Sequence, residues 1–113
     1  MTFDDIIDKY PGLFTDYEGS HCPDGWLPLV DEFCGRLVVE HPGVQINQLK
    51  EKFAELRVYV TDYICADLIE ETVERSRHIC QACGNLNAEI RDGFYWMVTL
   101  CDSCTETHGG VKR

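Results

Sequence analysis

Two pairs of cysteines near the C-terminal end constrain this chain more than any other feature. Cys80 and Cys83 enclose two residues, Cys101 and Cys104 enclose two more, and the spacing reads C-x2-C-x17-C-x2-C. A two-residue gap lets both sulfurs of a pair face one point, so two pairs can supply the four ligands of a tetrahedral zinc ion. A redox motif needs only one C-x-x-C, so two pairs favour a metal. Four thiolate ligands leave no position for a water molecule, and the pattern therefore predicts one zinc ion that is structural rather than catalytic.

The residues between the cysteine pairs predict how the pairs meet. Residues 88–91 and 94–99 read as strands, and Asp92-Gly93 between them is a strong signal for a two-residue hairpin turn. Gly84 follows the first pair, where the chain often needs a positive φ. A hairpin would bring the two pairs together, which is the layout of a zinc ribbon over residues 79–107.

Alternatives to this zinc site stay open. The four cysteines could be buried or redox-active thiols without a metal. His108 could act as a substitute ligand, and His78 precedes the site, although such histidines are more commonly surface side chains. A disulfide framework is disfavoured, because the chain has seven cysteines, an odd number, and no secretory signal.

The first 78 residues predict a mixture of helices and strands. Apolar residues recur with the helical period in three stretches, 2–10, 26–40 and 62–77. The expected apolar stripe of the third stretch is Ile64, Cys65, Leu68, Ile69 and Val73. Residues 44–49 and 56–60 alternate with period two and predict two strands joined through 50–55. A single helix over 47–57 is the competing interpretation.

These elements predict an α+β fold, in which a small helical domain with a short antiparallel hairpin precedes the four-cysteine zinc ribbon. The expected division is an acidic α+β domain over residues 1–78, the ribbon over 79–107, and a flexible tail over 108–113. With 113 residues, the chain is long enough for one compact domain with a small appendage.

Charge is the second unusual property. Twenty acidic and ten basic residues give a net charge of −10, and nine of the acids but only two bases lie in residues 1–40. Such a chain repels nucleic acid and anionic membranes over most of its surface. The acidic third could be a solvated face, or it could dock on a basic groove of another protein. The candidate partner-binding residues are Asp4, Asp5, Asp8, Asp16, Glu18 and, on the aromatic ribbon strands, Tyr95.

Several classes of protein are disfavoured by what the sequence lacks. It has no apolar run long enough to span a membrane and no signal peptide, so a cytoplasmic location is expected. It also has no H-E-x-x-H or G-x-S-x-G motif and no glycine-rich phosphate loop. The chain is therefore expected not to be an enzyme.

Several segments together resemble a group of small, mostly uncharacterised bacteriophage and prophage proteins. The resemblance covers most of the chain and rests on residues 9–14, 24–26, 48–53, 56–59, 79–84 and 99–101. In that group the last ligand position is often histidine, whereas here it is Cys104, an exchange that keeps a zinc site. The resemblance implies a phage origin and a setting in the host cytoplasm, and it implies no established activity.

Charge and resemblance together predict a non-catalytic protein that binds and inhibits a host protein. The expected partner has a basic surface, and a nucleic-acid-directed defence complex such as a CRISPR effector fits this description. No direct contact with nucleic acid or membrane is expected, and the oligomeric state is open. The alternative is a nucleic-acid-binding or transcription-associated ribbon, and a third hypothesis is a structural phage component. The second hypothesis requires a cluster of basic residues made by Lys50, Lys52, Arg57, Arg91, Lys112 and Arg113.

Overall fold

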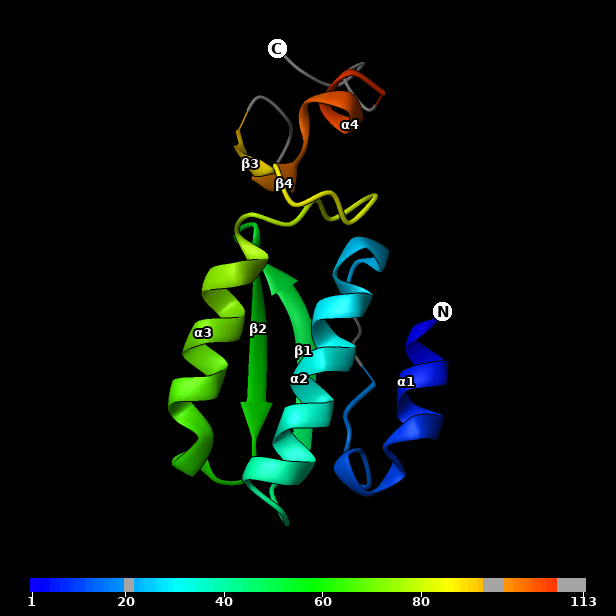
Figure 1. The fold of residues 1–113 in the computed structure, drawn as a ribbon, viewed down its shortest axis with the longest axis vertical. Helices are drawn as coiled ribbons and strands as arrows, with labels where there is room; N and C mark the ends of the chain where they lie inside the picture. The colour runs from blue at the N-terminus through cyan, green and yellow to red at the C-terminus, as the bar shows by residue number, and fades with distance from the viewer. Residues whose placement is uncertain (20–21, 93–96, 108–113) are drawn as a thin grey trace.

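A computed structural model confirms the expected α+β fold and describes residues 1–19, 22–92 and 97–107. The four helices and four strands of these residues follow one another along the chain as Figure 1 shows. They are α1 (Phe3–Lys9), α2 (Leu27–Glu40), β1 (Ile46–Lys52), β2 (Glu55–Val60), α3 (Ala66–Ser76), β3 (Glu89–Arg91), β4 (Val98–Leu100) and α4 (Asp102–Thr107).

Strands β1 and β2 form an antiparallel hairpin, so the competing helix over 47–57 is wrong. The pairing continues to Lys52 and Glu55, which leaves only Phe53 and Ala54 in the turn, with φ angles of 54° and 67°. Two successive positive φ angles are typical of a type I′ turn. The strands are longer than expected. The sequence does not locate the turn, because Phe53-Ala54 carries none of the glycine or asparagine signal that usually marks such a turn.

The helices cover one face of this hairpin and enclose the main core. In Figure 1, α2 lies in front of the strands, with α3 on the side of β2 and α1 on the opposite side. Apolar side chains from the helices meet those of the strands in one cluster, in which Trp26, Leu37, Leu49 and Leu56 are fully buried. Burial of this apolar surface is the main force that holds the layers together.

Helix α1 begins as its sequence predicts. The Thr2 hydroxyl accepts a hydrogen bond from the Asp5 N–H at 3.2 Å, and the Asp5 carboxylate accepts one from the Thr2 N–H at 2.8 Å. This reciprocal capping box satisfies two backbone donors that the helix itself leaves free.

The start of the third helix differs from expectation at Ile64, whose side chain is 69% exposed rather than buried. Residues Tyr63–Cys65 form a 3-10 turn, capped by the Asp62 carboxylate, and α3 begins only at Ala66. A 3-10 turn has three residues per turn, so Ile64 is rotated away from the apolar stripe. Further along α3, Thr72 and Ser76 are buried, and each satisfies its hydroxyl with a backbone carbonyl.

The C-terminal part lies at the turn end of the β1–β2 hairpin, which makes the molecule elongated, 45 × 25 × 22 Å (Figure 1). Strands β3 and β4 pair antiparallel, and a second small core contains Cys80, Ala88, Leu100 and Cys101. Of the predicted turn at Asp92-Gly93, only Asp92 belongs to the described residues. The candidate contact residue Tyr95 lies outside them. Helix α4, by contrast, was not expected from the sequence. None of the helices in the described parts of the chain is long and apolar enough to cross a membrane.

Candidate metal centre

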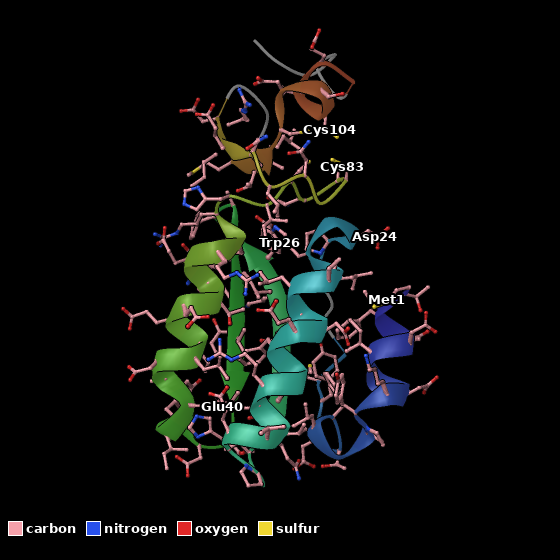
Figure 2. The ribbon with its side chains drawn as sticks, in the orientation of Figure 1. Met1, Asp24, Trp26, Glu40, Cys83 and Cys104 are labelled. Atoms are coloured by element: carbon pink, nitrogen blue, oxygen red, sulfur yellow. The ribbon has the colours of Figure 1, made fainter. Side chains whose placement is uncertain are left out.

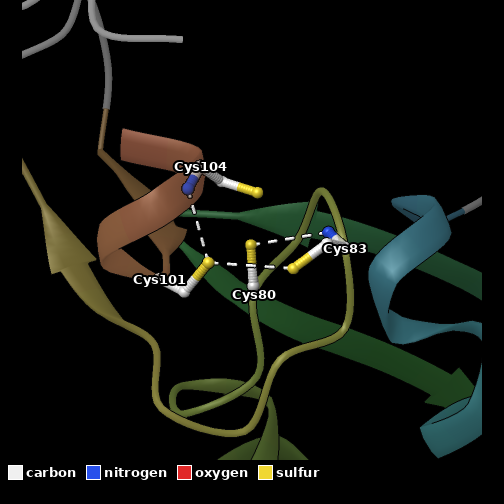
Figure 3. Close-up of side chains that lie close together, drawn as sticks. All are labelled: Cys80, Cys83, Cys101 and Cys104. Atoms are coloured by element: carbon white, nitrogen blue, oxygen red, sulfur yellow. Dashed lines mark hydrogen bonds between the residues drawn. The ribbon is translucent and has the colours of Figure 1, made fainter. Parts of the chain in front are cut away.

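The four predicted ligands, Cys80, Cys83, Cys101 and Cys104, come together at one point (Figure 3). Their Sγ atoms all lie within 4.8 Å of one another, and those of Cys83 and Cys101 are 3.7 Å apart. In a tetrahedral site with metal–sulfur bonds of about 2.3 Å, neighbouring sulfurs are roughly 3.8 Å apart. The arrangement therefore fits one metal ion held by four sulfurs.

The first cysteine pair lies in a tight turn and the second at the start of α4, and in each pair a backbone N–H points at a sulfur. The Cys83 N–H donates to the Cys80 Sγ at 3.5 Å, and the Cys104 N–H donates to the Cys101 Sγ at 3.4 Å (Figure 3). Gly84 closes the first turn with a φ of 85°, which confirms the positive angle expected there. Backbone dipoles aimed at sulfur favour its thiolate form, which is the form that binds a metal.

Without a metal, the surroundings favour the thiolate form of Cys80 but not that of Cys104. For Cys80, burial opposes ionisation, but the N–H groups of Cys101, Cys83 and Ala82 lower its pKa to about 6. Burial and hydrogen bonds with the neighbouring sulfurs raise the pKa of Cys104 to about 12. Four sulfurs this close cannot all be thiolates without a cation between them, so a bound metal would supply the charge that lets them ionise.

The first cysteine turn packs directly against the beginning of α2, where Figure 2 places Trp26 below Cys83. The Gly25 N–H donates to the Gln81 carbonyl at 2.8 Å, and the Trp26 indole Nε1–H donates to the Ile79 carbonyl at 2.8 Å. A Cβ on Gly25 would lie only 2.0 Å from the carbonyl oxygen of Cys80. Glycine is required here because the two backbones approach too closely for any side chain.

A second connection ties the site to the tip of the β1–β2 hairpin. The Thr99 hydroxyl donates to the Ala54 carbonyl at 2.7 Å, and both residues are fully buried. The Thr99 N–H donates to the Gln81 side-chain carbonyl at 2.7 Å, while the Gln81 N–H donates to the Thr99 carbonyl at 2.9 Å. Sequence reasoning missed these supporting residues. No local pattern signals a contact between Ala54 and Thr99, which are 45 residues apart, or between Gly25 and Cys80, which are 55 residues apart.

The two histidines considered as ligands have different outcomes. His78 is exposed, and its Nε2 lies 3.2 Å from a carboxylate oxygen of Glu74, so it is not part of the four-cysteine cluster. His108 lies outside the described residues. Arg91 is one of the basic residues considered for nucleic-acid binding, and its guanidinium lies 2.8 Å from a carboxylate oxygen of Asp102. Lys112 and Arg113 lie outside the described residues.

The acidic residues considered for partner binding are all exposed, on α1 and on the segment that follows it. Asp5 has an additional structural role in the capping box, and hydrogen bonds from the Thr2 backbone and hydroxyl lower its pKa. The exposed carboxylates considered for partner binding lie apart from the cysteine cluster and are Asp4, Asp5, Asp8, Asp16 and Glu18.

Comparison of the chain with protein-family models, with curated proteins and with solved structures finds no match.

Proposed function

We propose that the four cysteines hold one structural zinc ion. The observation that supports this is the convergence of four sulfurs within 4.8 Å from two backbone turns. Four thiolates favour zinc, and they fill its tetrahedral coordination, so no position is left for a substrate or a catalytic water. Zinc would stabilise a C-terminal region whose hydrophobic cluster, in the part that the structure describes, has four buried residues, among them the ligands Cys80 and Cys101.

We further propose that the chain is a non-catalytic protein that binds a partner through an acidic surface, formed by Asp4, Asp5, Asp8, Asp16 and Glu18. The distribution of ion pairs supports this. Every arginine in the described residues has a carboxylate within 4.0 Å, and Lys9 pairs with Asp31. Among the residues that the structure describes, no cation lies within 4.0 Å of a carboxylate of the acidic surface, which leaves negative charge where a basic partner could dock.

Aromatic contacts hold the two halves of the acidic surface together. The Phe3 ring lies 5.9 Å from that of Phe14 and 5.6 Å from that of Tyr17, measured between ring centroids. The Tyr17 hydroxyl also hydrogen-bonds both the N–H and the carbonyl of Leu49, which fixes the segment against β1. The carboxylates before and after Tyr17 are therefore presented by a fixed backbone, and a preformed surface binds at lower entropic cost.

The resemblance to bacteriophage and prophage proteins extends this proposal to a host target. An exposed array of carboxylates resembles the phosphate array that a nucleic-acid-directed complex accepts in its basic channel. On this hypothesis the protein inhibits such a complex, for example a CRISPR effector, by occupying that channel.

The experiment is affinity capture from host lysate with the zinc-loaded protein, with and without nuclease. Asp4→Lys/Asp8→Lys reverses two exposed charges and leaves the Asp5 cap intact. We expect a protein partner that survives nuclease treatment and is lost with this double variant, because the variant removes charge from the docking surface.

The matched control is Asp67→Lys/Glu70→Lys, which reverses two exposed carboxylates on α3. It should retain the partner, because it changes the net charge equally on another face. Equal retention by both double variants would refute the acidic surface. A partner that disappears with nuclease would instead indicate a tether of nucleic acid.

A further inference from the structure

The β1–β2 hairpin has an outer face that the helices do not cover. Because side chains alternate along a strand, Lys50, Lys52, Arg57 and Tyr59 lie on the face opposite to the buried Leu49, Leu56 and Val58. Phe53 extends this face at the turn. We call Lys50, Lys52, Phe53 and Tyr59 the hairpin face.

The hairpin face carries two lysines without an ion-pair partner among the described residues, whereas Lys9 and every arginine of those residues lie beside a carboxylate. Within the described parts of the chain, neither Lys50 nor Lys52 has an ion pair with a carboxylate, whereas Arg57, opposite Lys50 in the strand pairing, lies 3.0 Å from a carboxylate oxygen of Glu55. Each lysine lies beside an aromatic ring instead: the Nζ of Lys50 is 5.6 Å from the ring centroid of Tyr59, and that of Lys52 is 5.6 Å from that of Phe53. Each of the two lysines thus has an aromatic ring beside it, Tyr59 at one end of the pair and Phe53 at the turn.

Phe53 occupies a position for which folding alone would favour another residue. It has a φ of 54°, a region that favours glycine or asparagine, and its side chain is 64% exposed. A large apolar ring in a strained turn contributes little to the core. Such an outlier is more readily explained by a contact with a ligand than by stability.

We propose that the hairpin face binds single-stranded nucleic acid. Exposed aromatic rings on a sheet stack on unpaired bases, and neighbouring lysines neutralise the phosphates. A duplex is disfavoured, because its bases are already stacked and because a net charge of −10 repels a dense phosphate array. This proposal is independent of the acidic surface, since the two share no residue.

The test is fluorescence anisotropy of a labelled oligothymidylate and a labelled oligouridylate, titrated with the zinc-loaded chain at several salt concentrations. Two lysine–phosphate contacts predict a slope of log K against log[salt] of about −1.4 for a single strand. Lys50→Glu/Lys52→Glu should weaken binding by at least about tenfold and flatten this slope. The single variants Lys50→Glu and Lys52→Glu are each compared with Lys9→Glu, which makes the same change in net charge on α1 and should bind as the wild type does.

Two aromatic variants test the stacking. Phe53→Asn and Tyr59→Ala should each lower the affinity about tenfold, equivalent to ~1.4 kcal/mol. Phe53→Asn suits the turn geometry, so it should raise the melting temperature while it weakens binding. Tyr63→Ala, at an exposed tyrosine of the 3-10 turn before α3, is the control and should leave the affinity unchanged.

Three outcomes would overturn the proposal. They are the absence of binding to both oligonucleotides at low salt, an equal loss of affinity in Lys9→Glu and Lys50→Glu/Lys52→Glu, and binding that is indifferent to both aromatic variants. Tighter binding of polyglutamate than of either oligonucleotide would assign the hairpin face to an acidic protein segment and would also refute the nucleic-acid proposal.

Discussion

At the scale of single residues, Gly25 joins the four-cysteine site to the main core. Its missing side chain allows the backbone of the first cysteine turn to lie against the start of α2. We predict that Gly25→Ala lowers the free energy of unfolding by about 1–3 kcal/mol, because a Cβ there forces the two backbones apart. Urea unfolding followed by tryptophan fluorescence measures this change.

Gly12→Ala is the matched control for this prediction. No atom lies within 4 Å of a Cβ built on Gly12, and its φ is not positive. This variant should keep or slightly raise stability, because alanine restricts the unfolded chain more than glycine does. Similar stability losses in the two variants would contradict the close approach at Gly25.

At the scale of elements, the hairpin tip and β4 are held together by the hydroxyl of Thr99. We predict that Thr99→Val, which keeps the shape of the side chain, destabilises the protein by about 1–3 kcal/mol, because the buried carbonyl of Ala54 loses its donor. The midpoint of urea unfolding, with the zinc-loaded protein, reports the change.

Thr105→Val provides the comparison on α4. The Thr105 hydroxyl donates to the Cys101 carbonyl, but that carbonyl also accepts the Thr105 N–H at 2.9 Å. Its loss should therefore cost less than the loss at Thr99. A Thr99→Val protein as stable as the wild type would show that the hairpin tip and the C-terminal region are not coupled through this bond.

Local patterns explain which elements were predictable from the sequence. Three features follow from patterns among residues close in sequence. They are the capping box at Thr2 and Asp5, the helical period of α2, and the two-residue gap within each cysteine pair. The turn at Phe53 and Ala54 was not located, because its geometry is imposed by strand pairing rather than by turn residues. The contact of Gly25 with Cys80 depends on the tertiary fold, so no local spacing indicates it.

At the scale of the whole molecule, buried thiols make stability sensitive to alkaline pH. Burial raises the pKa of Cys22 and of Cys34 from 9.0 to about 12. The unfolded chain therefore loses these protons at lower pH than the folded chain does. The stabilisation is complete below the unfolded pKa of 9.0 and is lost as the pH rises towards about 12.

We thus predict that the free energy of unfolding decreases between about pH 8 and about pH 10.5, and that Cys22→Ala/Cys34→Ala decreases less over this interval. Urea unfolding at the two pH values, each with zinc present, measures both slopes. The double variant is less stable at both values because it loses apolar contacts, so the comparison uses the change with pH. Equal changes in the two proteins would contradict the assignment.

The metal centre is tested most directly by native mass spectrometry of the purified chain, alongside Cys83→Ser. Cys83 is the exposed ligand, so its replacement disturbs the packing of the chain least. We predict one zinc ion for each wild-type chain, and a variant that loses zinc at a chelator concentration the wild type withstands. A wild-type chain that carries no metal after zinc is supplied, or a variant that retains zinc as firmly, would contradict a four-cysteine zinc centre.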